Sequence, residues 1–194
     1  MKTLPTKEIA RKLNFLFKKR ARFEWEYLTG QWNTLKSPFE YERFNALVEL
    51  TAEYVKGASI LEVGSGEGLL LPKISTDYDY FLGIDISEIA ISRANLMKSD
   101  KVSFIRADFE NFVPDRKFDL IIFNESLYYS KKPVEVLERY KSFLCGYKII
   151  ATSIHENRLG LRLVKYMQDH YQCLDSKQTK NIRGRWYCNI FRMA

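Results

Sequence analysis

The stretch Ile60-Leu-Glu-Val-Gly-Ser-Gly-Glu-Gly68 decides the fold. It begins inside a short apolar run, residues 59–63, that predicts a buried strand, and glycines follow directly. Because glycine has no Cβ, such a turn lets a ligand approach the backbone and offers amide donors to it. A helix is expected after the turn, shortened or kinked by Pro72. Several nucleotide-binding folds share a glycine-rich turn, so the surrounding sequence has to narrow the choice.

Short apolar runs alternate with amphipathic stretches from residue 59 onward. Continuous apolar runs of this length are typical of strands buried on both faces, as in a parallel sheet. They predict strands over residues 59–63, 80–84, 102–105, 118–123 and 147–154. The alternation of strand and helix predicts an α/β fold, a doubly wound three-layer sandwich with right-handed crossovers.

Helices are expected between these strands. Ser87 caps one, and Pro133 opens a second, with Gly146 after its end. A third helix is expected to start near Asn157, because apolar residues recur after it at helical spacing. These helices supply the outer layers of the predicted sandwich.

The two ends of the chain depart from the alternation. Residues 1–57 are predicted to form an N-terminal helical cap ahead of a core of residues 58–194, within one compact domain. Near the C-terminus, residues 171–179 and 185–191 are strand-like and are separated by a turn-prone segment with no helix. Such a pair must form a hairpin. The prediction is therefore a mostly parallel seven-stranded sheet with an antiparallel C-terminal strand.

Length and composition fit one globular domain. The chain has 194 residues, 46% hydrophobic and 28% charged. No apolar run approaches the roughly 18 to 20 residues that cross a bilayer, so we expect no membrane span and a cytoplasmic location. Cys145, Cys173 and Cys188 are odd in number and include no C-x-x-C pair. Their spacing argues against a zinc site and a disulfide framework, and no metal is expected.

Basic residues exceed acidic ones by 31 to 24, a formal charge of +7. Much of the excess lies near the start, at Lys7, Arg11, Lys12, Lys18, Lys19, Arg20 and Arg22. One interpretation is a basic arm for nucleic acid, an anionic membrane or a phosphorylated substrate. We favour the solvated face of a helix, whose apolar side carries Ile9, Leu13, Leu16 and Phe17. A small molecule is therefore the favoured partner over nucleic acid.

Three acids lie in or just after predicted strands, where ligands bind in open parallel sheets. Asp85 follows Gly64 by about 20 residues, where a carboxylate can accept both hydroxyls of a ribose, as it also does in NAD enzymes. Asp108 can bind an adenine amino group while the ring of Phe109 covers the base. Glu62 lies inside the first strand, where a buried charge needs a partner, either an ammonium group or the amides of the glycine turn.

Four segments together resemble the motifs of class I S-adenosylmethionine-dependent methyltransferases. They are Glu62-Val-Gly-Ser-Gly-Glu-Gly68, Gly83-Ile-Asp-Ile-Ser87, Arg106-Ala-Asp108 and Phe118-Asp-Leu-Ile-Ile-Phe-Asn-Glu125. Each motif is loose alone, but four in order at suitable spacings are quite specific, and the likeness runs roughly from Trp32 to the C-terminus. The terminal hairpin fits too, because that family adds an antiparallel strand that NAD-binding folds lack. The chain is most similar to the subgroup with the nodulation N-methyltransferase and enzymes that modify sugars or small metabolites.

The resemblance implies S-adenosyl-L-methionine as the cofactor and assigns residues to it by position. The implied cofactor-binding residues are Trp32, Glu62, Gly64, Ser65, Gly66, Asp85, Ile86, Asp108, Phe109 and Asn124. The glycine turn would flank the methionine part, with Glu62 towards its ammonium group. Asp85 would bind the ribose and Ile86 would pack on the adenine, which Asp108 and Phe109 hold.

Two further roles complete this assignment. Asn124 would lie beside the reactive methyl group, with its carbonyl near the methionine amine. Trp32, or Trp25 and Tyr27 before it, would close the site as a lid.

The acceptor side is less defined by the sequence. His155 and Glu125 are the candidate catalytic residues, since each follows a predicted strand at the ligand-binding edge, and histidine is the residue type most often used for proton transfer. Tyr128 and Tyr129 are candidates for substrate contact. The competing interpretations are a capping or surface histidine, a structural hydrogen bond of Glu125 and ordinary packing of the tyrosines.

The sequence departs from two methyltransferase subgroups. Asn124 is followed by Glu125 and Ser126, so the Asn-Pro-Pro-Tyr type of motif used on nucleobase amines is absent. Cys145 precedes Gly146 rather than following a proline, so a cytosine C5 nucleophile is absent too. The favoured function is methyl transfer to an oxygen or nitrogen of a small molecule, such as a sugar, nucleotide-sugar or secondary metabolite. An RNA or protein methyltransferase, an inactive cofactor-binding subunit and an NAD-dependent oxidoreductase are the alternatives.

Overall fold

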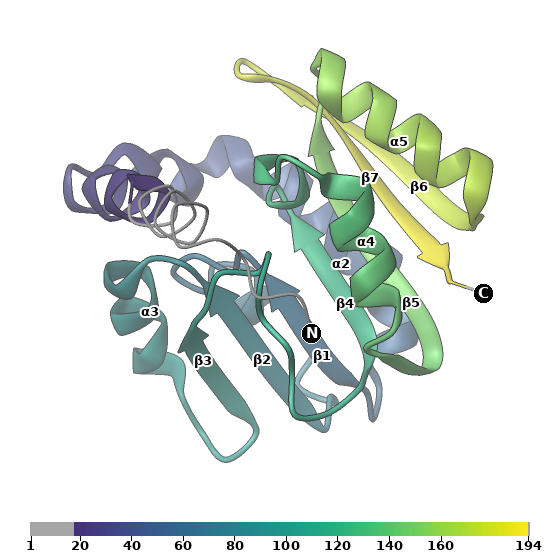
Figure 1. Cartoon of the computed structure of the whole chain (residues 1–194), viewed down its shortest axis with the longest axis horizontal. Helices are drawn as coiled ribbons and strands as arrows, with labels where there is room; N and C mark the ends of the chain where they lie inside the picture. Colours follow the sequence, from purple (N-terminus) through teal and green to yellow (C-terminus); the bar gives the residue numbers. More distant parts are fainter. Residues whose placement is uncertain (1–17, 194) are drawn as a thin grey trace, which may run out of the picture.

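The apolar runs form the strands of one sheet in the computed structural model, which describes residues 18–193 (Figure 1). Its strands are β1 (Ser59–Val63), β2 (Tyr80–Asp85), β3 (Val102–Arg106), β4 (Phe118–Asn124), β5 (Leu144–His155), β6 (Gln172–Asn181) and β7 (Gly184–Arg192). All five strands predicted from apolar runs are therefore confirmed. Four of them extend one residue further at the carboxyl end, which brings Asp85 and Asn124 into the sheet.

The strand order is β3-β2-β1-β4-β5-β7-β6. β1 pairs in parallel with β2 on one side and β4 on the other, so the order reverses beside β1. β7 runs antiparallel between β5 and β6, which confirms the predicted hairpin and the antiparallel last strand. The carboxyl ends of β1, β2 and β4 meet at the reversal point, where sheets of this kind bind ligands.

The helices are α2 (Tyr41–Val55), α3 (Glu88–Ala94), α4 (Pro133–Lys141) and α5 (Arg158–His170), and residues 18–28 are also helical. Ser87 Oγ accepts a hydrogen bond from Ala90 N at 3.2 Å, and Asn157 Oδ1 accepts one from Gly160 N at 2.8 Å. These bonds satisfy amides that the first turn of a helix leaves free. The predicted starts of α3 and α5 are thereby confirmed.

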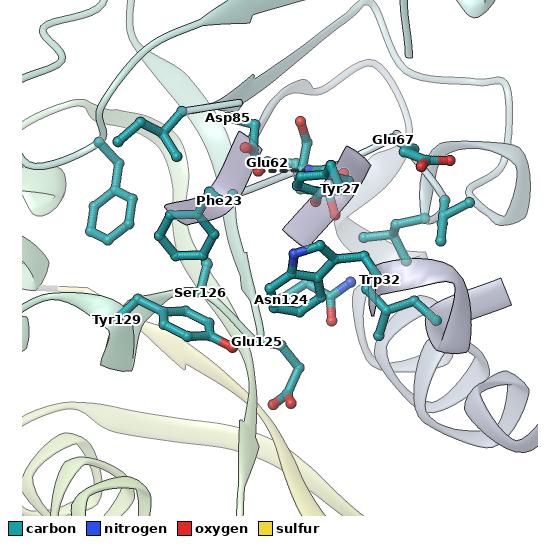
Figure 2. A pocket seen from close by; sticks show the side chains of 18 of the residues that line it. Phe23, Tyr27, Trp32, Glu62, Glu67, Asp85, Asn124, Glu125, Ser126 and Tyr129 are labelled. Carbon is teal, nitrogen blue, oxygen red and sulfur yellow. Dashed lines mark hydrogen bonds between the residues drawn. The ribbon is translucent and has the colours of Figure 1, made fainter. Parts of the chain in front are cut away.

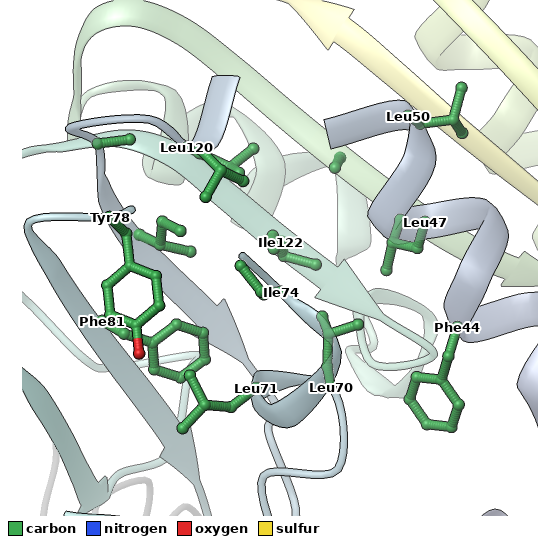
Figure 3. Packing of buried hydrophobic residues seen from close by; sticks show 14 of the residues in the cluster. Phe44, Leu47, Leu50, Leu70, Leu71, Ile74, Tyr78, Phe81, Leu120 and Ile122 are labelled. Atoms are coloured by element: carbon green, nitrogen blue, oxygen red, sulfur yellow. The ribbon is translucent and has the colours of Figure 1, made fainter. Parts of the chain in front are cut away.

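Helices cover both faces of the sheet and complete the predicted three layers (Figure 1). On one face, Leu47 of α2 and Ile91 of α3 share a buried cluster with Ile60 and Ile122 of the central strands, part of which Figure 3 shows. On the other face, α4 and α5 bury side chains such as Leu137. Each fully buried aliphatic side chain contributes about 1.5–3 kcal/mol, so the central strands are held firmly from both faces.

Two expectations about helix boundaries are wrong. No α-helix follows the glycine turn, because Pro72 lacks an N–H and its ring clashes with a helical backbone, and the chain makes only a 3-10 turn, η3 (Leu71–Lys73). Gly146 does not end a helix; it lies inside β5 with φ +48°, where β5 bulges against β4. Cys145 lies in the same strand rather than at a helix end.

The basic N-terminus is only partly described. Lys7, Arg11 and Lys12 and the expected apolar side, Ile9, Leu13, Leu16 and Phe17, lie outside the described residues. Lys19, Arg20 and Arg22 each form an ion pair with an acid. Within residues 18–193, no helix is long and apolar enough to cross a membrane.

Candidate active site

A cavity lies at the carboxyl ends of β1, β2 and β4, under the helix of residues 18–28. Twelve residues predicted for the site line it: Trp32, Glu62, Gly64, Ser65, Gly66, Asp85, Ile86, Asp108, Phe109, Asn124, Glu125 and Tyr129. Two predicted residues, Tyr128 and His155, are not part of this lining. The cavity therefore gathers the ends of three parallel strands, as the sheet topology requires.

The glycine turn bends around the end of β2. Gly64 N and Ser65 N donate to Ile84 O at 2.8 and 2.9 Å, and Gly66 N donates to Asp85 Oδ2 at 3.0 Å. The expectation that this turn offers its amides to a ligand is therefore wrong for these three, because β2 already uses them. A phosphate group needs free amides at the start of a helix, so this turn is poorly suited to a dinucleotide.

Close neighbours require glycine at two positions of the turn. Gly64 and Gly66 have φ values of +73° and +55°, which side chains rarely adopt. A Cβ on Gly64 would lie 2.5 Å from Ser126 Cβ, and one on Gly66 would lie 2.6 Å from Tyr27 Oη. The backbone of the turn thus forms one wall of the cavity directly.

Asp85 is buried at the carboxyl end of β2. Burial raises its pKa to about 6, although the amides of Ser87 and Gly66 favour the charged form. Its two oxygens accept from Ser87 N at 2.9 Å and from Gly66 N at 3.0 Å. Figure 2 shows Asp85 in the cavity wall near Glu62. A carboxylate has about four acceptor positions, so Asp85 can still accept from the hydroxyls of a ligand.

Glu62 is the most buried acid of the cavity, with 1% of its surface exposed. Burial raises its pKa to about 8, while a hydrogen bond with Asn124 and the charge of Arg43 oppose the shift. Glu62 Oε2 has no hydrogen-bond partner among residues 18–193. A buried, unpartnered carboxyl oxygen is costly, so this position is suited to a cationic ligand group.

Asp108 lies at the far side of the cavity, after β3. Its Oδ1 accepts from Lys19 Nζ at 3.2 Å and from Glu110 N at 3.1 Å. Its Oδ2 is buried and has no partner in the described part of the chain. Lys19 Nζ also lies 4.9 Å from the centre of the Phe109 ring. Asp108 and Phe109 thus offer one free acceptor beside an aromatic ring.

The helix of residues 18–28 closes the cavity from above. Glu24 of this helix accepts from Ser87 Oγ at 2.8 Å and from the amides of Glu88 and Ile89 at 2.7 and 3.2 Å. These contacts bind it to the start of α3, where a negative charge is favourable. Together with Lys19 on Asp108, they hold the helix over the strand ends.

Aromatic rings fill the space between this helix and the sheet (Figure 2). Trp32 stacks on Phe23 and Tyr27, with ring centres 6.3 and 5.8 Å apart, and meets Tyr129 edge-on at 6.3 Å. Trp32 and Tyr27 therefore lie where a lid is expected. Trp25, the third aromatic considered for that role, is 65% exposed and does not line the cavity.

Two arginines that sequence reasoning missed line the cavity, and both bind Glu40. Arg43 of α2 is 2% exposed; its Nε donates to Glu40 Oε2 at 2.8 Å and its Nη1 donates to Asn124 Oδ1. Arg183, in the turn between β6 and β7, donates from Nη1 to Glu40 Oε1 at 2.6 Å. Nothing local in the sequence marks either arginine, because the chain brings them together from segments about 140 residues apart.

Glu125 directly follows β4 and lines the cavity beyond Tyr129 and Trp32 (Figure 2). Burial raises its pKa, opposed by Arg43, Trp186, Tyr128 and His155. His155 reaches the cavity only indirectly: its ring meets Trp186 edge-on at 5.0 Å, and its Nε2 lies 3.3 Å from Arg183 O.

The sequence matches the family model described as a methyltransferase domain over residues 55–189. It is 29% identical over 107 residues to nodulation protein S of Bradyrhizobium diazoefficiens, covering 54% of this chain and 51% of that protein. It is 30% identical over 100 residues to nodulation protein S of Sinorhizobium fredii, covering 50% and 46%. The chain spans about half the length of the curated relatives it matches.

Solved structures show the same fold. The N-methyltransferase NodS of Bradyrhizobium japonicum in complex with S-adenosyl-L-homocysteine superimposes with a TM-score of 0.72 at 19% identity, over 92% of this chain and 96% of that one. The Burkholderia thailandensis 1,6-didemethyltoxoflavin-N1-methyltransferase superimposes with a TM-score of 0.76 at 15% identity, over 100% and 92%. The predicted doubly wound fold is confirmed by these likenesses.

Proposed function

The chain belongs to the methyltransferase domain family, and we propose that it transfers a methyl group from S-adenosyl-L-methionine to an oxygen or nitrogen atom of a small molecule. One observation carries the proposal. Two acids in the same cavity, Glu62 and Asp108, each keep a buried oxygen without a partner among the described residues. Asp85 lies buried at the end of the strand between theirs. These three acids suit a ligand that carries a cationic group at one end, hydroxyl groups in the middle and a hydrogen-bond donor at the other end.

S-adenosyl-L-methionine fits that description group by group. Its ammonium group would face Glu62, its ribose hydroxyls would face Asp85, and its adenine amino group would face Asp108. Ile86 and Phe109 line the cavity and would cover the adenine. The amides of the glycine turn are already bonded to β2, which favours this phosphate-free cofactor over NAD.

Arg43 adds a partner that the cofactor also requires. Its guanidinium donates to Asn124 Oδ1, and its charge opposes the rise in the pKa of Glu62. A cation and an acid of the protein therefore lie close together at this end of the cavity. An α-amino acid carries an ammonium and a carboxylate group on neighbouring atoms. We therefore assign Glu62 to the ammonium group and Arg43 to the carboxylate of the methionine part.

When bound, the cofactor supplies a methyl group on a sulfonium, which is an activated leaving group. The protein then mainly has to hold the acceptor in line with the bond that breaks, and orientation of this kind is worth several kcal/mol. Glu125 is the candidate base, because its carboxyl group lies in the cavity and burial raises its pKa. Tyr129 is the candidate acceptor contact on the same side.

We also propose that residues 1–57 form a cap on a core of residues 58–194. The helix of residues 18–28 supports this division, since it contributes Lys19, Phe23 and Tyr27 to the cavity wall. A small acceptor is favoured over RNA, because Lys19, Arg20 and Arg22 of that helix are each paired with an acid. Salt-dependent RNA binding would support the alternative.

Calorimetry with S-adenosyl-L-homocysteine tests the cofactor assignment. Asp85→Ala should weaken binding by at least about tenfold, because hydrogen bonds to a charged group are worth roughly 1.5–3 kcal/mol. Asp100→Ala is the matched control, since Asp100 is an exposed acid outside the cavity. Equal affinity of Asp85→Ala and wild type, or binding of NAD in place of S-adenosyl-L-homocysteine, would contradict the proposal. Tight binding without turnover on any acceptor would favour an inactive subunit.

A further inference from the structure

Glu125 has a backbone conformation that only few residues adopt. Its φ is +59°, in the left-handed region that costs a residue with a Cβ about 1 kcal/mol or more. Its N–H donates to Ser153 O at 3.0 Å, so the pairing of β4 with β5 holds the residue there. Strained residues persist where the surrounding structure fixes them, and such positions cluster at functional sites.

The register of β4, β5 and β7 brings Glu125 close to Ser153 and Trp186: Asn124 pairs with Ser153, and Trp186 pairs with His155. Glu125 Oε1, Trp186 Nε1 and Ser153 Oγ are all buried and have no hydrogen-bond partner in the described part of the chain. Trp186 is 2% exposed, and its indole lies close enough to Glu125 to favour the charged carboxylate. An indole N–H can only donate, so the Glu125 carboxylate is its natural acceptor.

Several titratable or charged groups surround this carboxyl group. Arg43 comes from α2, Tyr128 and Tyr129 from η5 (Leu127–Tyr129), His155 from β5 and Cys188 from β7. Burial is the main cause that raises the pKa of both tyrosines and of Cys188, and the charge of Glu125 raises each of them further. Arg43 is the cation among them, and it already binds Glu40 and Asn124.

We propose that Glu125 accepts the proton of the methyl acceptor and that Trp186 is its positioning residue. The indole N–H of Trp186 holds the carboxylate at the side of the cavity away from Glu62 and Asp85. This inference rests on the proposed methyl transfer. As the bond from carbon to sulfur breaks and the bond from carbon to the acceptor atom forms, the acceptor's proton passes to Glu125 and later to water. The sulfur keeps the electron pair of the broken bond.

His155 supports Trp186 from behind in this arrangement. Its ring meets the indole edge-on, and a Cβ on Gly184 would lie 2.3 Å from its Nε2. The histidine is thus wedged between the indole and the β6–β7 turn. We therefore assign His155 a packing role and assign the proton transfer to Glu125.

Nuclear magnetic resonance of the indole N–H groups tests the positioning without cofactor or acceptor. The chain has only Trp25, Trp32 and Trp186, so three indole signals are expected, and Trp32→Phe serves as the matched control. The Trp186 signal should shift with pH as Glu125 ionises, with a midpoint above the ordinary value for glutamate. Glu125→Gln should keep the signal and abolish that step.

A second measurement separates Glu125 from its neighbour His155, which touches the same indole. The step assigned to Glu125 should survive in His155→Phe and vanish in Glu125→Gln. In Trp186→Phe, the carboxyl carbon signal of Glu125 should titrate at least about one pH unit higher than in wild type, because a donor to the charged form is lost.

The outcomes separate this inference from the proposed function. A Trp186 signal that stays constant with pH, or that shifts equally in Glu125→Gln, overturns the role of Trp186. An unchanged Glu125 midpoint in Trp186→Phe overturns it as well. Failure of wild type to bind S-adenosyl-L-homocysteine instead contradicts the proposed function, whatever the indole signals show.

Discussion

Replacing Glu62 by glutamine tests the cationic end of the cofactor site. Burial raises the pKa of Glu62 to about 8, so about nine tenths of the free protein carries neutral Glu62 at pH 7. A bound ammonium group would favour the carboxylate. Binding of S-adenosyl-L-homocysteine at pH 7 should therefore release close to one proton. Glu62→Gln keeps the size of the side chain but has no proton to release.

The size of the effect follows from the pKa. Each pH unit below the pKa adds about 1.4 kcal/mol to the cost of ionising Glu62 before it can bind the ammonium group. The affinity of the wild-type protein should therefore rise about tenfold from pH 6 to pH 7. Glu62→Gln should bind more weakly at pH 7, with an affinity that stays flat over this range.

Calorimetry in two buffers of different ionisation enthalpy measures the released protons directly. Glu67→Gln is the matched control, because Glu67 lines the same cavity but is already ionised at pH 6 to 7. Burial alone would raise the pKa of Glu67, but Lys36 and Arg93 lower it below its ordinary value. Absence of proton release in wild type, or the same pH slope in Glu62→Gln, would refute the assignment of Glu62 to an ammonium group.

The same substitution has a predictable effect on the stability of the free protein. The folded-state pKa of Glu62 lies above its value in the unfolded chain, so the folded state binds more protons between about pH 4.5 and pH 8. Glu62 therefore lowers the free energy of unfolding as pH rises through this window. Glu62→Gln should melt at a higher temperature than wild type at pH 8, and this advantage should disappear at pH 4.

Two glycine substitutions test the backbone walls of the site. Gly66→Ala should weaken S-adenosyl-L-homocysteine binding and speed amide hydrogen exchange in residues 18–28. The reason is that φ at Gly66 is +55° and the new Cβ would lie 2.6 Å from Tyr27 Oη. Unchanged affinity and exchange rates would argue against this role of the turn. Gly184→Ala should lower Tm by several degrees, because φ at Gly184 is +143° and the new Cβ would lie 2.3 Å from His155 Nε2. A Tm equal to that of wild type would show that the β6–β7 turn can shift freely.

The strands and the cofactor end of the cavity could be predicted because their signals are local. A buried parallel strand is predicted by a continuous apolar run, and the carboxyl ends of β2 and β3 are marked by Asp85, the last residue of β2, and Asp108, just after β3. Strand ends in a parallel sheet meet at one edge. Glu62, Asp85 and Asp108 therefore line one cavity without any knowledge of distant contacts.

The missing helix after the glycine turn illustrates a limit of motif reasoning. The motif is typical of a turn followed by a helix, and Pro72 was expected only to shorten or kink it. In the structure, Gly68, with φ +75°, lies four residues before Pro72, so too little chain remains for an α-helix before the 3-10 turn. The ligand site consequently has no helix N-terminus at this turn.

The acceptor side could not be predicted because its contacts join segments far apart in the sequence. Arg183 in the β6–β7 turn binds Glu40, and Asn181 of the same hairpin donates to Phe39 O at 2.7 Å. His155 was expected at the site because it lies at the carboxyl end of β5. Its backbone does lie at that end of the strand, but its side chain does not line the cavity. Which neighbours its side chain meets depends on the hairpin, whose register no local pattern reveals.

The two ends of the cavity thus have different structural origins, and this difference has a consequence for substitutions. The cofactor end is built from strand ends that the core holds from both faces, so a change there alters packing and cofactor affinity together. The proposed acceptor end lies beside the β6–β7 turn, where Arg183 of the cavity lining binds Glu40, the residue just before α2. Changes in that turn can therefore alter the choice of acceptor while the cofactor stays in place, which makes Arg183 the first position to vary when acceptors are compared.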